Sequence, residues 1–123
     1  MAYTSSALAL FMYGLKADDT RRQYPARLKK FFEFIGVEGA SFEQQCENFA
    51  VCARQDPDYA YGSIIQFLDH MNGKARKKEI VFGTVNNYYK SIKKFYDMNS
   101  INLNWNPEDL LKIDHQLKKK FED

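Results

Sequence analysis

The stretch TVNNYYKSIKKFYDMN, residues 84–99, decides the fold class of this chain. Its apolar residues recur at steps of three and four, the spacing that places side chains on one face of an α-helix. Thr84 precedes them as an N-cap, since its hydroxyl can accept a backbone N–H of the first turn. We therefore expect a helix from Thr84 to about Asn99. Its inward positions are Val85, Tyr88, Tyr89, Ile92, Phe95 and Tyr96.

Two more helices are expected in the first 36 residues. Ser5 or Ser6 caps a short one that runs to about residue 15, where Gly14 weakens its end. The next begins with the capping box Thr20-Arg-Arg-Gln and stops at Gly36. Pro25 lies just after its first turn, so this helix either kinks there or begins later. The inward positions are Leu8, Phe11, Met12 and Leu15, then Tyr24, Leu28, Phe31, Phe32 and Ile35.

Two helices are also predicted between residues 41 and 73. Ser41 opens the capping box SFEQ of a helix that ends near Arg54, and Asp56-Pro57 begins a helix that ends near Gly73. Their inward positions are Phe42, Cys46, Phe49, Ala50 and Ala53, then Tyr61, Ile64, Ile65, Leu68 and Met71. We expect residues 74–83 to form a basic loop, in which residues 80–82 are extended as a short strand.

A last helix is predicted after Asn106-Pro107, with Leu110, Ile113, Leu117 and Phe121 on its inner stripe. The sequence thus predicts an all-α domain of five or six helices, arranged as an antiparallel bundle or as two crossed helix pairs.

Composition indicates one domain spanning residues 1–123. The chain is 45% apolar and 15% aromatic, which is enough to bury a core. No apolar stretch approaches the roughly 20 residues of a bilayer span, so we expect no membrane association and a cytoplasmic location. Cys46 and Cys52 lie six residues apart in one predicted helix, too far for a disulfide, and are expected to be reduced.

The sequence lacks the patterns of an enzyme or a metal site. It contains no glycine-rich phosphate-binding motif, and His70 and His115 are not at zinc-ligand spacing. Asp56 with Asp58, and Glu108 with Asp109, fall in first turns of predicted helices, where the helix dipole favours negative charge. We expect no catalytic residue, no metal, no cofactor and no enzymatic activity of this chain on its own.

The net charge of +2 hides a segregation of charge along the chain. Residues 20–36 carry a net +4 and residues 73–95 a net +6, whereas residues 37–72 between them carry −5. If the fold brings the two basic blocks together, the domain has the basic face of a polyanion binder. The alternative is that these lysines and arginines only solvate helix faces.

The outward face of the predicted helix 84–99 suits DNA. Asn86, Lys90 and Lys93 are spaced i, i+4, i+7, an Asn amide can pair with an adenine edge, and Lys can reach guanine or a phosphate. Thr84 and the N–H groups beside it can hold a phosphate, and two other basic segments supply further contacts. The predicted DNA-binding residues are Thr20, Arg21, Arg22, Lys29, Lys30, Lys74, Arg76, Lys77, Lys78, Thr84, Asn86, Asn87, Lys90, Lys93 and Lys94.

The order of these motifs resembles the N-terminal core-binding domain of tyrosine recombinases of the phage-integrase type, in particular of archaeal integrases. The family's T-x3-Y-x3-L-x2-F-x2-F helix is matched by Thr20, Tyr24, Leu28, Phe31 and Phe34. Residues 84–99 and then 101–105 look like the family's last core-binding helices. The resemblance implies a SAM-like domain of crossed helix pairs that clamps duplex DNA while a separate C-terminal catalytic domain closes the other side.

The family's catalytic pattern is not matched. His115-Gln-Leu-Lys118 ends in Lys where the family has His-x-x-Arg, so we expect the catalytic domain to be absent from this chain. Tyr24, Tyr88 and Tyr96 are therefore interpreted as core residues rather than nucleophiles. Residues 117–123 fit the family least and are interpreted as the beginning of a linker or a helix that docks on a neighbour.

Three functions follow from these observations. The first is the DNA-binding clamp of a recombinase, with duplex DNA, the C-terminal catalytic domain and a second copy on DNA as partners. The second is a standalone DNA-binding accessory factor. The third is a helical protein–protein interaction module that uses the acidic segment 37–72.

Overall fold

The computed structural model describes residues 6–102, and in this range the chain forms five α-helices. They are α1 (Ala7–Tyr13), α2 (Asp18–Ile35), α3 (Phe42–Gln55), α4 (Pro57–Arg76) and α5 (Phe82–Met98). No strand occurs among residues 6–102, so the predicted all-α class is confirmed. The helix expected after Asn106-Pro107 lies outside the described residues. None of the five helices is long and apolar enough to cross a membrane.

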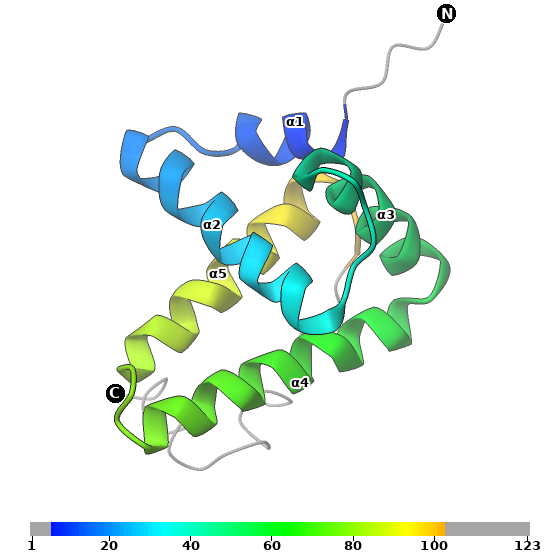
Figure 1. Ribbon diagram of the computed structural model, residues 1–123. Helices are drawn as coiled ribbons and strands as arrows, with labels where there is room; N and C mark the ends of the chain where they lie inside the picture. Colours follow the sequence, from blue (N-terminus) through cyan, green and yellow to red (C-terminus); the bar gives the residue numbers. More distant parts are fainter. Residues whose placement is uncertain (1–5, 103–123) are drawn as a thin grey trace, which may run out of the picture.

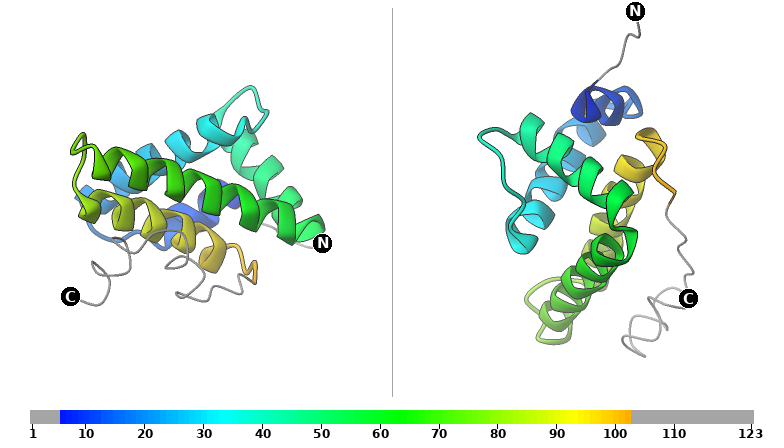
Figure 2. Two further views of the ribbon diagram at one scale, coloured as in Figure 1. Left: turned by 90° about the horizontal axis from the view of Figure 1, so that it is seen from below. Right: turned by 90° about the vertical axis from the view of Figure 1, so that its right-hand side faces the viewer.

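The helices pack in crossed pairs. α4 and α5 diverge from the turn that joins them, and α2 crosses α5 (Figure 1). Seen from below, α4 lies in front, with α2 and α3 behind it (Figure 2). α1 packs against α3 and against α5. The crossed arrangement is the one that the sequence predicted as the alternative to a simple antiparallel bundle.

Buried aromatic rings hold the helices together. Phe31 of α2 contacts Phe49 of α3 and Phe67 of α4, with ring centroids 5.4 and 5.3 Å apart. Its neighbour Phe32 contacts Phe95 of α5 at 6.1 Å. Successive residues of a helix point about 100° apart, so these two phenylalanines reach different partners. All the predicted inward positions in the five helices are buried or half-buried.

Three of the predicted helix starts are confirmed by side-chain caps. Ser6 accepts from the N–H of Ala9, Ser41 from that of Gln44 and Asp56 from that of Tyr59. Each oxygen satisfies a backbone donor that the first helical turn would otherwise leave without a partner.

The two threonine caps were predicted wrongly. α2 begins at Asp18, so Thr20 lies inside its first turn, and α5 begins at Phe82, so Thr84 does as well. The N-cap residues are Ala17 and Val81, and neither makes a side-chain cap bond. Asp18 and Asp19 stabilise the start of α2 through the helix dipole instead.

Pro25 neither delays nor interrupts α2. The helix is already two turns long at this residue, and it continues to Ile35. The alternative in which the helix begins later is therefore wrong. Gly36 ends the helix with φ 74°, in the left-handed conformation that glycine adopts without strain, as predicted.

α4 runs past Gly73 to Arg76, so its predicted end was wrong. The residue in the left-handed conformation is Lys78, with φ 63°. Its N–H donates to the carbonyl of Ala75 at 3.0 Å, and the N–H of Glu79 donates to that of Lys74 at 2.9 Å, which is a Schellman motif. A glycine inside a helix costs only about 1 kcal/mol, less than burying Ala75 and its neighbours returns. The predicted loop 74–83 shrinks to residues 77–81, without the predicted strand.

Polar contacts tie the start of α1 to α3 and α5. The Glu47 carboxylate of α3 accepts from the N–H of Ala7. The side-chain amide of Asn99 donates to the carbonyls of Ala7 and Phe95, at 3.2 and 3.0 Å. Arg54 donates to the Asn99 carbonyl at 2.9 Å. These bonds fix a seven-residue helix that would not be stable alone.

Candidate nucleic-acid interface

A groove of about 390 Å³ opens between α2, α4 and the start of α5. Its volume is in the range of small-ligand sites. The residues that line it are Lys30, Glu33 and Phe34 of α2, Phe67, His70, Met71 and Lys74 of α4, Ile80 of the turn, and Thr84 and Tyr88 of α5.

The wall of this groove is aromatic. Phe67 meets the ring of Tyr88 at 5.3 Å and the ring of Phe34 at 5.4 Å. Phe34 also lies 4.9 Å from the His70 ring, with only 32° between the two planes. Phe34 is 43% exposed, whereas Phe31 and Phe32 are fully buried. Aromatic surface therefore remains open to a ligand on this side of α2.

The groove joins the two basic blocks of the sequence. Lys30 belongs to the block in residues 20–36, Lys74 to that in residues 73–95, and both line the groove. Neither lysine makes an ion pair with another described residue. Thr84, the third predicted site residue that lines the groove, presents its side chain from the first turn of α5. Its own N–H donates to the Val81 carbonyl at 3.0 Å, so that donor is already used within the protein.

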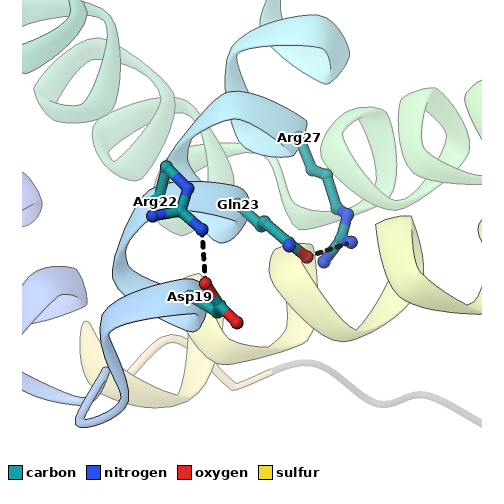
Figure 3. Close-up of polar contacts among 4 residues, drawn as sticks. All are labelled: Asp19, Arg22, Gln23 and Arg27. Atoms are coloured by element: carbon teal, nitrogen blue, oxygen red, sulfur yellow. Dashed lines mark hydrogen bonds and ion pairs between the residues drawn. The ribbon is translucent and has the colours of Figure 1, made fainter.

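The other predicted cations of α2 have partners within the protein. The guanidinium of Arg21 donates to the carbonyls of Met12 and Leu15, both at 2.8 Å, and so braces the connection between α1 and α2. Arg22 pairs with Asp19, the pair seen beside Arg27 and Gln23 in Figure 3. Lys29 lies over the Phe42 ring of α3, 5.0 Å from its centroid.

The end of α4 presents exposed basic residues. Arg76, Lys77 and Lys78 follow Lys74 at the C-terminus of this helix, where cations favour the helix dipole. All three are exposed, and they stand in and beside the short turn that leads to α5. The sequence predicted a loop over residues 74–83. In the structure Arg76 belongs to α4, like the groove residue Lys74, and Lys77 and Lys78 follow it directly.

The outward face of α5 is as polar as the sequence predicts. Lys90 and Lys93 are exposed, whereas Asn86, Asn87 and Lys94 are half-buried. The ammonium group of Lys93 donates to the Asp97 carboxylate at 2.9 Å, and this bond raises the pKa of Lys93.

Three groove residues were not among the predicted site residues: Glu33, Phe34 and His70. His70 is exposed on α4, and its contact with Phe34 was not foreseen. One signal could have found Phe34, because this aromatic residue lies outside the predicted inward stripe of its helix. Lys30 precedes Phe34 by one helical turn, which places both side chains on the same flank.

The metal-ligating and acidic residues do not gather at the groove in the described part of the chain. Among residues 6–102, no group of three or more His, Cys, Asp or Glu side chains is placed to hold a metal ion. Both cysteines are free, as expected. The acidic residues Glu43, Glu47 and Asp58 are exposed on α3 and at the start of α4 rather than along the groove.

Comparisons with protein-family models, with curated proteins and with solved structures found no match for this chain. The resemblance to core-binding domains therefore rests on the sequence motifs alone.

Proposed function

We propose that this domain binds duplex DNA, as the clamp domain of a tyrosine-type recombinase. The observation that carries the proposal is the meeting of the two basic blocks at one groove, through Lys30 of α2 and Lys74 of α4. Clusters of lysine and arginine on one side of a fold are the electrostatic mark of nucleic-acid binding. The recombinase role rests in addition on the sequence resemblance.

In this proposal the outward face of α5 enters the major groove of DNA. An α-helix with its side chains is about 10–12 Å across, and the major groove is about 12 Å wide. Asn86 and Lys90 lie on this face and can meet base edges, while Lys77 in the adjacent turn reaches a phosphate. The segments that supply phosphate contacts thus flank the helix that reads bases.

The two ion pairs that involve predicted DNA-binding residues do not oppose DNA binding. Lys93 and Asp97 form an exposed pair, as do Arg22 and Asp19. Exposed pairs contribute about 0–1 kcal/mol, so a phosphate can replace the carboxylate at little cost. Arg21 differs, because its guanidinium is already bonded to two backbone carbonyls. We expect Arg21 to stabilise the α1–α2 connection and to contribute least to DNA affinity.

Fluorescence anisotropy of the full chain with a labelled duplex, over a series of salt concentrations, tests the proposal. We expect affinity to fall steeply with salt, and Lys77→Gln to reduce the log–log slope by about 0.9, the loss of one phosphate contact. The double charge reversal Lys90→Glu with Lys93→Glu is expected to abolish binding without changing the helical circular dichroism.

Lys16→Glu is the matched control, since Lys16 is exposed but lies before α2, next to the Tyr13 ring. It should leave duplex affinity nearly unchanged. Absence of duplex binding at low salt would contradict DNA binding and favour the protein–protein interaction module. A covalent adduct between this chain and a nicked duplex would contradict its role as a non-catalytic clamp.

A further inference from the structure

Two aromatic rings of the groove, those of Phe34 and His70, remain exposed outside the closed core. α2 already buries Phe31 and Phe32 completely, while Phe34, two residues later, stays 43% exposed beside the ring of His70. The two rings come from α2 and α4, and with centroids 4.9 Å apart and only 32° between their planes they stack on each other across the two helices. The outer face of this stack is suited to a further planar group.

A lysine flanks each of these rings at one helical turn. Lys30 precedes Phe34 by four residues on α2, and Lys74 follows His70 by four residues on α4. All four side chains line the groove, and neither lysine is paired with another described residue. Aromatic rings between two ammonium groups that no other described residue pairs match a ligand that joins a flat ring to an anion.

We propose that the groove binds one unpaired nucleotide, with its base on Phe34 and His70 and its phosphate between Lys30 and Lys74. That this nucleotide belongs to a DNA strand rests on the proposed function. The bases of an intact duplex are stacked on one another, so a base reaches Phe34 only when it is unpaired or at a strand end.

Glu33 makes the site selective. Glu33 lines the same groove as the two lysines, and its negative charge repels additional phosphates and so disfavours a polyphosphate or a continuous backbone. A carboxylate can also accept a hydrogen bond from the exocyclic amino group of a base. We therefore expect adenine to bind better than thymine, which lacks that group.

The test uses the full chain and three probes that contain the fluorescent adenine analogue 2-aminopurine. They are the free nucleoside monophosphate, a single-stranded trinucleotide, and a duplex with one bulged 2-aminopurine, compared with the same duplex fully paired. We expect the bulged duplex to bind about tenfold more tightly than the paired one, the effect of one base stacked on an aromatic side chain. Its fluorescence should be quenched on binding.

Phe34→Ala is expected to remove this preference and to leave the affinity for the paired duplex unchanged. The double variant Lys30→Gln with Lys74→Gln should weaken the trinucleotide and the bulged duplex more than the paired duplex. Tyr59→Ala is the matched control, because Tyr59 is an exposed aromatic residue that does not line the groove. It should leave the preference intact.

The outcomes separate the two proposals. Equal affinity for the bulged and paired duplexes, with no quenching, overturns the nucleotide site while leaving duplex binding in place. Quenching of the trinucleotide without duplex binding supports the nucleotide site and overturns the clamp. If the free monophosphate binds as tightly as the trinucleotide, the ligand is a free nucleotide rather than a strand. Binding of an acidic peptide in place of all three probes overturns the nucleotide site.

Discussion

Phe32 and Phe34 are two residues apart on α2 and lie in regions of opposite character. Phe32 is fully buried against rings of α3 and α5, whereas Phe34 is 43% exposed at the groove, where its ring meets Phe67 and His70. A phenylalanine side chain therefore packs in the core at position 32 and lines the solvent-exposed groove at position 34. The difference lies in how many helices pack around each position, which is a property of the tertiary structure.

The largest expected effect is on the core. Phe32→Ala removes a fully buried ring and should lower the free energy of unfolding by about 3–5 kcal/mol. Phe34→Ala should cost less than about 1 kcal/mol, since much of this ring already contacts water. Urea denaturation followed by circular dichroism measures both. A loss from Phe34→Ala as large as that from Phe32→Ala would show that the groove wall is part of the core.

The second largest effect is expected from alkaline pH, which should lower the free energy of unfolding. Burial, followed by the charges of Glu47 and Glu43, raises the pKa of Cys46 to about 12. Between pH 9 and 12 the unfolded chain loses this proton while the folded chain keeps it, so stability falls as pH rises, by up to about 1.4 kcal/mol per pH unit. Below pH 9 this effect is absent.

Cys46→Ala should reduce that decline, measured as the urea midpoint from pH 8 to 11. Part of the decline should remain, because burial also raises the pKa of Tyr96. An unchanged decline in Cys46→Ala would contradict the assignment to this thiol.

Asn99 tests the polar edge of the core. Its buried amide donates to the carbonyls of Ala7 and Phe95. Asn99→Ala leaves the Ala7 carbonyl without this donor and should cost about 1–3 kcal/mol. Hydrogen exchange should show the loss first at the amides of α1, because α1 depends on this contact. Uniform loss of protection across all five helices would argue against so local a role.

Lys78 lies at the groove end of the molecule and combines a strained backbone with a predicted phosphate contact. With φ 63° it occupies a region that costs a non-glycine residue about 1–2 kcal/mol. Lys78→Gly should raise thermal stability by about 1 kcal/mol while lowering the salt dependence of DNA binding. Lys77→Gln, one residue earlier, should lower the salt dependence without the gain in stability. Equal stability of the two variants would contradict the strain.

The smallest effect is expected at Asn72. This side chain is fully buried on α4, and neither of its amide atoms has a hydrogen-bond partner among the described residues. Asn72→Leu has nearly the same shape and buries no unpaired polar group, so it should change stability by between 0 and about +1 kcal/mol. Thermal melting compares it with Asn99→Ala. A clear loss of stability in Asn72→Leu would show that the Asn72 amide makes hydrogen bonds in solution.

The helices could be predicted well because their signals are local. Apolar residues at steps of three and four identified the inward faces of the five described helices. Ser41 and Asp56 were identified as caps, and the first cap was narrowed to Ser5 or Ser6, of which the structure shows Ser6. The errors fell where packing outweighs a local preference. Gly73 does not end α4, and Thr20 and Thr84 do not begin their helices.

Of the candidate site, the sequence predicted the basic residues but not the groove that joins some of them. Lys90 and Lys93 share one exposed face of α5 because both lie on a single helix, and that relation follows from spacing alone. Lys30 and Lys74 meet only because α2 packs across α4. The partners that Arg21 and Lys29 find on other elements were equally invisible, since periodicity does not say which helix faces which.

The sequence by itself determined the all-α class of the described residues and the division of the charge into blocks, because helix formation and capping depend on residues within a few positions of one another. Only the tertiary structure decided that Phe34 and His70 stay open between two lysines, while Phe31 and Phe32 close the core. Exposure of a side chain depends on the crossing of helices distant in sequence. That crossing is set by how all five apolar faces pack together, and no single stretch of sequence contains it.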